Sequence, residues 1–159
     1  MDVLLTRLQP GLQLVFAKYS GKHAMPGQKS ASMSLEEFID MMSDAGLVDD
    51  RFGHREVGPL WNLSMMTNKH ELESDRHLNM SFVECLEALA RCADKFDRKH
   101  LNDSFPASKS KNPAQLDKKL EAIILRLLEA NMPPKQYEQA LAKYRCQLEL
   151  DLPGQGNQK

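Results

Sequence analysis

A short stretch of this chain is written twice. The segments MSLEEF, at residues 33–38, and MSFVEC, at residues 80–85, lie 47 residues apart. In each segment a serine is followed three residues later by a glutamate, which is the pattern of a capping box at the start of a helix. Two helices that begin with the same capping pattern predict that the chain folds as two similar units.

Each serine is followed by apolar residues at helical spacing. The first helix is predicted to end near Gly46, with Leu47 packing beyond a glycine cap. Its stripe consists of Leu35, Phe38, Ile39 and Met42. The second stripe is longer and consists of Phe82, Cys85, Leu86, Leu89, Ala93 and Phe96. Both stripes predict amphipathic helices that cover one core.

An entering helix is expected before each repeated stretch, since residues 14–20 align with residues 61–67 at the same offset. The pair Pro10-Gly11 is expected to interrupt the first helix, which leaves residues 2–8 as a separate short helical turn. The second entering helix is predicted from about His54. Met33 and Met80 directly precede the two serines, and we expect both to be buried in a two-stranded bridge between the loops.

This layout resembles a paired EF-hand, in which the eighth loop position is apolar and the twelfth is a glutamate. Glu37 and Glu84 take the twelfth position, and Met33 and Met80 take the eighth. The resemblance covers about residues 11–97. It implies an all-α fold in which residues 1–100 form an EF-hand-like pair, with units at about 11–46 and 54–97.

The run MSFVECLEALARCADKF, at residues 80–96, is also similar to degenerate EF-hand-like modules of ciliary and flagellar proteins. That resemblance implies a calmodulin-like structural or regulatory role on the axoneme. It also implies a location in the cytoplasm, on the cytoskeleton of a cilium or flagellum.

The calcium pattern of the family is missing from the first loop. Pro26, Gln28 and Ser30 stand at positions one, three and five, where carboxylates belong. Calcium requires several oxygen ligands, most of them charged. We therefore expect no calcium at the first loop.

The second loop leaves two alternatives. Glu73, Asp75 and Asn79 stand at positions one, three and seven, and Glu84 ends the loop. These residues are the ligands if a metal site remains, and the chain is then a calcium sensor that regulates a partner protein. Leu78, however, stands at the sixth position, where a tight turn normally requires glycine. We expect a solvated polar loop, with no metal and no cofactor.

The composition changes after the second unit. Residues 101–114 are expected to form a polar linker, and residues 115–150 a hairpin of two helices, at 115–130 and 135–148. Residues 151–159 are expected to be disordered. The preferred alternative is that the hairpin packs back on the EF-hand-like pair and completes one core. The other is that it occupies the partner-binding surface or docks on another protein.

The net charge of −1 favours neither nucleic acid nor membrane as a partner, although basic residues gather between positions 95 and 119. We weigh a basic contact with an acidic surface, such as tubulin, against a merely solvated strip, which is preferred. The candidate contact residues are Lys109, Lys111, Lys118 and Lys119.

No catalytic constellation is present in the sequence, and the chain is interpreted as not an enzyme. The three cysteines are too few for a disulfide framework. Cys85 and Cys92 lie seven residues apart and are expected to share a buried helix face. This arrangement favours reduced thiols in a reducing compartment.

Binding of a protein partner is therefore the predicted activity. The candidate core or groove residues are Phe38, Met41, Met42, Trp61, Met65, Met66 and Leu89. Adjacent methionines cannot both face inward from one stripe, so one of each pair is expected near the surface. The sequence thus predicts a calcium-independent adaptor or structural protein, with a tubulin-like or axonemal partner.

Overall fold

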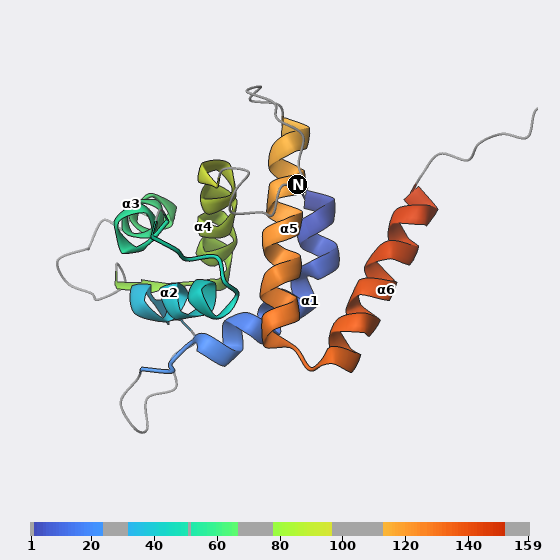
Figure 1. Ribbon diagram of the computed structural model, residues 1–159, viewed down its shortest axis with the longest axis horizontal. Coiled ribbons are helices and arrows are strands. Elements are labelled where there is room, and N and C mark those ends of the chain that lie inside the picture. Colours follow the sequence, from blue (N-terminus) through green and yellow to red (C-terminus); the bar gives the residue numbers. More distant parts are fainter. Residues whose placement is uncertain (1, 24–31, 51, 67–77, 97–112, 152–159) are drawn as a thin grey trace, which may run out of the picture.

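The computed structural model of the protein describes residues 2–23, 32–50, 52–66, 78–96 and 113–151. Nearly all regular structure in these residues is helical, which confirms the all-α prediction (Figure 1). The elements are α1 (Asp2–Tyr19), β1 (Met33–Ser34), α2 (Leu35–Asp44), α3 (His54–Ser64), β2 (Asn79–Met80), α4 (Phe82–Lys95), α5 (Pro113–Asn131) and α6 (Pro134–Asp151).

The two repeated stretches begin helices as the sequence predicts. Ser34 and Ser81 are the N-caps of α2 and α4, and each forms a complete capping box with the glutamate three residues later. The end of α2 is also as predicted. Gly46 has φ +64° and donates to Ser43 O, while Leu47 N–H donates to Met42 O. These two hydrogen bonds form a Schellman cap, in which the left-handed position favours glycine.

The loops of the two units meet in a short antiparallel bridge. Met33 pairs with Met80, and Ser34 pairs with Asn79. Both methionine side chains are fully buried. The predicted bridge is therefore confirmed, and it joins the start of α2 to the start of α4.

The entering helices differ from the prediction. α1 runs without interruption from Asp2 to Tyr19, so the expected break at Pro10 is wrong. Proline removes one backbone donor and normally bends a helix rather than ending it when tertiary packing supports both halves. Figure 1 shows α1 changing direction along its length. α3 begins at His54 as predicted but ends at Ser64, slightly before the expected end.

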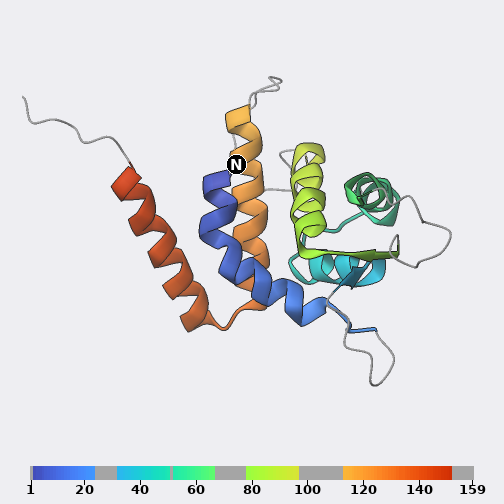
Figure 2. The ribbon, with the colours of Figure 1, turned by 180° about the vertical axis from the view of Figure 1, so that it is seen from behind.

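The C-terminal helices lie across the fold from α3. α5 packs against α1, α2 and α4, whereas α6 packs against α1 and α5. Figures 1 and 2 both place α4 between α3 and α5, and α6 on the far side of α1. Pro134 opens α6, as predicted for a proline in a first helical turn. The predicted packing of the hairpin on the first two units is thus observed for α5.

One apolar core runs through these elements. Phe16 packs edge-on against Phe82, and the Phe52 ring centroid lies 4.3 Å from that of Phe96. Cys85 and Cys92 are buried and free on one face of α4, as predicted, whereas Cys146 is exposed on α6. The expected linker falls on residues outside the described part, except that residues 113 and 114 belong to α5. The expected tail lies outside it too, apart from residue 151 in α6.

Candidate functional site

The glutamate that begins α2 is held by the chain on both of its oxygens. The Glu37 side chain is only 3% exposed. Its Oε2 accepts the Ser34 N–H at 2.8 Å, and its Oε1 accepts the His23 N–H at 2.9 Å. Because His23 follows α1, this carboxylate ties the end of the entering helix to the start of α2.

The glutamate that begins α4 has the same arrangement. The Glu84 side chain is 2% exposed. Its Oε2 accepts the Ser81 N–H at 2.7 Å and the Ser81 hydroxyl at 2.6 Å. Its Oε1 accepts the Met66 N–H at 2.8 Å, and Met66 follows α3. We call these two carboxylates, with their backbone donors, the glutamate clamps.

The first clamp has a clear electrostatic signature. Burial by itself raises the pKa of Glu37. The backbone N–H groups of His23, Ser34 and Gly21, with the Ser34 hydroxyl, outweigh that effect by stabilising the charged form, so the net pKa is lowered. A carboxylate that accepts two backbone hydrogen bonds is charged and satisfied without a cation.

The structure describes two of the four metal-ligand candidates, Asn79 and Glu84. Glu84 is committed to its clamp, and Asn79 lies half-buried in the bridge. Glu73 and Asp75 lie outside the described residues. In the ranges the structure covers, no group of three or more His, Cys, Asp or Glu side chains is placed to hold a metal ion.

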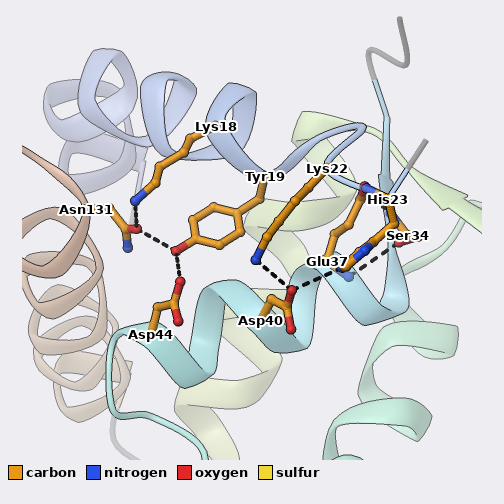
Figure 3. A network of polar contacts seen from close by, with 9 residues as sticks. All are labelled: Lys18, Tyr19, Lys22, His23, Ser34, Glu37, Asp40, Asp44 and Asn131. Atoms are coloured by element: carbon orange, nitrogen blue, oxygen red, sulfur yellow. Dashed lines mark hydrogen bonds and ion pairs between the residues drawn. The ribbon is translucent and has the colours of Figure 1, made fainter. Parts of the chain in front are cut away.

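A polar network extends from the first clamp along α2 (Figure 3). Asp40 Oδ2 lies 2.8 Å from Lys22 Nζ and 3.1 Å from His23 Nε2. The hydrogen bonds from Lys22 and His23 lower the pKa of Asp40, and the bond to Asp40 raises the pKa of Lys22. These groups are largely exposed, so the network orients the turn after α1 more than it stabilises the fold.

The same network ends in a joint between three helices. The Tyr19 hydroxyl of α1 lies 2.5 Å from Asp44 Oδ2 of α2 and 2.6 Å from Asn131 Oδ1 of α5. Lys18 Nζ donates to the same amide oxygen at 2.8 Å, and Asn131 Nδ2 donates to Leu127 O at 2.9 Å. Burial and the hydrogen bond to Asp44 raise the pKa of Tyr19. We call this group the Tyr19 joint; Figure 3 shows its side chains converging from all three helices.

The predicted groove residues are mostly core. Phe38 and Trp61 lie with ring centroids 5.7 Å apart, and both are buried, as is Leu89. Met65 is half-buried and Met66 is 70% exposed, as expected for an adjacent pair. Met41 and Met42 are both buried, so that expectation is wrong for the pair in α2. The reason is that α2 packs against α1, α3 and α5, which cover more than one of its faces.

The face that α1, α2 and α4 present together, which we call the α1–α2–α4 face, is covered by α5. Five aliphatic side chains of α5 are buried, and each is at most 1% exposed. They are Leu120, Ile123, Ile124, Leu127 and Leu128. At Gly11 an added Cβ would lie 2.9 Å from a Leu128 methyl carbon, so the Leu128 side chain would have to shift. Gly11 therefore lies where α1 meets α5 and does not mark a break in α1.

The basic strip is only partly described. Lys118 is exposed, and Lys119 is half-buried with its Nζ 3.4 Å from Asp94 O. Lys109 and Lys111 lie outside the described residues. The strip therefore stays a prediction.

Sequence reasoning missed the Tyr19 joint and half of each clamp. Asn131 lies 112 residues from Tyr19, and no local pattern links the two. The donors His23 and Met66 follow no motif either, because any residue carries a backbone N–H. The capping-box half of each clamp was predictable, since it depends only on residues three apart.

None of the helices within the described ranges is both long and apolar enough to cross a membrane. Comparison with known proteins adds no relative: no family model, curated protein or solved structure matches the chain.

Proposed function

We propose that this chain is a non-enzymatic, calmodulin-like adaptor or structural protein, built from two degenerate EF-hand-like units and a C-terminal helical hairpin. The proposal that it works without calcium rests on one observation. Both Glu37 and Glu84, which stand at the twelfth loop position, use their two oxygens on backbone donors of their own unit.

The pairing of the units supports the EF-hand-like part of the proposal. Each unit has an entering helix, a loop, an apolar bridge residue and a capped exiting helix, in the same order. The Met33–Met80 bridge lies at equivalent positions of the two loops. Such a bridge couples the units, so that one cannot move far without the other.

The clamps supply the physical reason for calcium independence. A calcium site needs its final glutamate to turn both oxygens toward the ion. Here that rotation would break the hydrogen bond that the glutamate accepts from the N–H of His23 or Met66, at the end of the entering helix, and that donor would lose its partner. The clamp therefore competes directly with any cation for the same oxygens.

The axonemal role is a proposal from sequence resemblance. Its support is the similarity of residues 80–96 to ciliary EF-hand-like modules, together with the basic residues between positions 95 and 119. The proposed partner is a protein with an acidic surface, such as tubulin or an axonemal protein.

Calcium titration tests the central claim. Trp61 is the one tryptophan of the chain and packs on Phe38 in the first unit, so its fluorescence reports on the paired core. The expected result, in physiological salt and magnesium, is no heat of binding and no change in fluorescence up to millimolar calcium. A saturable response that is lost in Glu84→Gln, and kept in Glu87→Gln, would identify a calcium sensor instead.

Microtubule co-sedimentation tests the partner. Binding that weakens with salt is expected if the strip is a charged contact. Replacing Lys109, Lys111, Lys118 and Lys119 together should then abolish it. No co-sedimentation at low salt would refute tubulin as the partner and leave the calcium result unaffected.

A further inference from the structure

The Tyr19 joint brings one hydroxyl within hydrogen-bond distance of two oxygen atoms. The Tyr19 hydroxyl lies 2.5 Å from Asp44 Oδ2 of α2 and 2.6 Å from Asn131 Oδ1 of α5 (Figure 3). Burial raises the pKa of Tyr19, so the hydroxyl keeps its proton. A tyrosine hydroxyl carries one hydrogen, however, and donates it to one oxygen at a time.

The orientation of the Asn131 amide is fixed by its two other contacts. Its oxygen accepts from Lys18 Nζ at 2.8 Å, and its nitrogen donates to Leu127 O at 2.9 Å. A flipped amide would set its nitrogen against the lysine ammonium and its oxygen against the Leu127 carbonyl, and neither pair can form a hydrogen bond. Asn131 therefore presents to Tyr19 an oxygen, which can only accept.

The joint thus contains two acceptors and one proton between them, because a charged carboxylate is also only an acceptor. When the proton lies toward Asp44, the oxygens of Tyr19 and Asn131 face each other at 2.6 Å with no hydrogen between them. When it lies toward Asn131, the same conflict arises between Tyr19 and Asp44. One of the two hydrogen bonds is always left unmade.

The charge of Asp44 decides which of the two bonds forms. A hydrogen bond to a charged acceptor is stronger than one between neutral groups, so the carboxylate takes the proton from the neutral amide oxygen. Asp44 is the last residue of α2 and is exposed. Its charge is therefore accessible to groups outside the chain.

The neighbouring charged groups do not remove this conflict. Lys18 and Lys22 lie over the Tyr19 ring, with Nζ 5.2 and 5.5 Å from the ring centroid. Lys18 Nζ donates to the amide of α5, and Lys22 Nζ donates to Asp40 Oδ2, each at 2.8 Å. None of these groups supplies a second proton to the Tyr19 hydroxyl, so the choice of acceptor depends on Asp44.

We propose that the Tyr19 joint is a charge-controlled latch between α2 and α5. With Asp44 charged, the Tyr19 hydroxyl bonds to α2 and leaves Asn131 to Lys18. When a cationic group of a bound partner neutralises Asp44, the hydroxyl proton moves to Asn131 and fastens the end of α5. Because α6 begins after only two further residues, the latch also acts on the corner between α5 and α6.

The substitution Asp44→Asn tests the latch in the full chain, because it removes the charge and keeps the size of the side chain. The new amide nitrogen can donate to the Tyr19 oxygen, which frees the Tyr19 hydroxyl to donate to Asn131. The readout is hydrogen exchange of the Met132 N–H, which donates to Leu128 O at 2.9 Å at the end of α5. Trp61 emission checks that the core stays folded.

The same substitution is also made in a chain that carries Tyr19→Phe, which has no hydroxyl to redistribute. This control is needed because a carboxylate at the C-terminal end of a helix opposes the helix dipole, so its removal can stabilise α2 by itself. An effect of the dipole is the same in both chains. An effect of the latch occurs only where Tyr19 is present.

Exchange of the Met132 N–H is expected to be about fivefold slower in Asp44→Asn than in the wild-type chain, the effect of one added neutral hydrogen bond. No such slowing is expected when Tyr19→Phe is present.

Three results would overturn the proposal. Faster exchange in Asp44→Asn shows that the carboxylate supports the joint rather than competing for its proton. Unchanged exchange shows that the position of the proton does not affect α5. Equal slowing with and without the Tyr19 hydroxyl assigns the effect to the dipole of α2.

Discussion

The second glutamate clamp gives the sharpest quantitative prediction. Glu84 accepts two backbone N–H groups, from Met66 at 2.8 Å and from Ser81 at 2.7 Å, and it is almost completely buried. The substitution Glu84→Gln keeps the size of the side chain. It replaces one accepting oxygen with an amide that can only donate.

The expected cost follows from these contacts. Whichever way the new amide is oriented, one backbone N–H, of Met66 or of Ser81, loses its acceptor, which costs about 1 kcal/mol because these bonds are only part-buried. The remaining bond changes from charge-assisted to neutral, which costs about 1 kcal/mol more. Removing a buried charge offsets part of this loss. We expect the free energy of unfolding to fall by about 1–2 kcal/mol.

Urea unfolding, followed by Trp61 fluorescence and by circular dichroism, measures this change. With a slope of about 2 kcal/mol per molar urea, the midpoint should fall by about 0.5–1 M. The matched control is Glu87→Gln in the same helix, where the exposed carboxylate is paired only with Arg91 at 2.8 Å. That substitution should change the free energy of unfolding by no more than about 0.5 kcal/mol.

The reasoning fails if both variants unfold at the same urea concentration. Such a result would mean that the Met66 N–H and the Ser81 N–H find water or other acceptors at no cost. The second clamp would then not contribute to the free energy of unfolding. The physical argument for calcium independence would be refuted as well.

Three further predictions concern other parts of the chain. The pKa of Glu37 is lower in the folded chain than in the unfolded one. Its contribution to stability is therefore present above the ordinary glutamate pKa of about 4.3 and is lost as pH falls through the folded value. Glu37→Gln should flatten the acid limb of a curve of unfolding free energy against pH. Gly46→Ala should destabilise the chain by about 1–2 kcal/mol in thermal or urea unfolding, because φ is positive there. Cys146 is exposed and should react rapidly with a thiol reagent in the native chain. Cys85 and Cys92 should react only after unfolding, because they are buried and burial raises the pKa of both thiols. Three equally fast reactions in the native chain would contradict this prediction.

Features set by residues close together in the sequence were predictable. The capping boxes at Ser34 and Ser81, the glycine cap at Gly46 and the pairing of Met33 with Met80 follow from short spacings and from the repeat itself. Each depends on hydrogen bonds or faces that involve at most a few neighbouring positions. The all-α class follows from the same local patterns.

The continuity of α1 and the burial of both methionines in α2 were decided by tertiary packing. Pro10-Gly11 predicts a break if only local propensity is considered, yet α5 packs along α1 and Leu128 uses the space that Gly11 leaves. Met41 and Met42 cannot both be buried by one neighbour, and α2 has more than one. Local propensities of a few kcal/mol are overridden where a long helix buries a continuous apolar stripe.

The polar part of the candidate site divides in the same way. The sequence by itself determined which glutamates begin α2 and α4, because a capping box spans only three residues. Only the tertiary structure decided that their second oxygens accept the N–H groups of His23 and Met66, and that Tyr19 meets Asn131. Backbone donors are identical at every position, and residues 112 apart share no periodicity, so the packing of whole helices selects these partners.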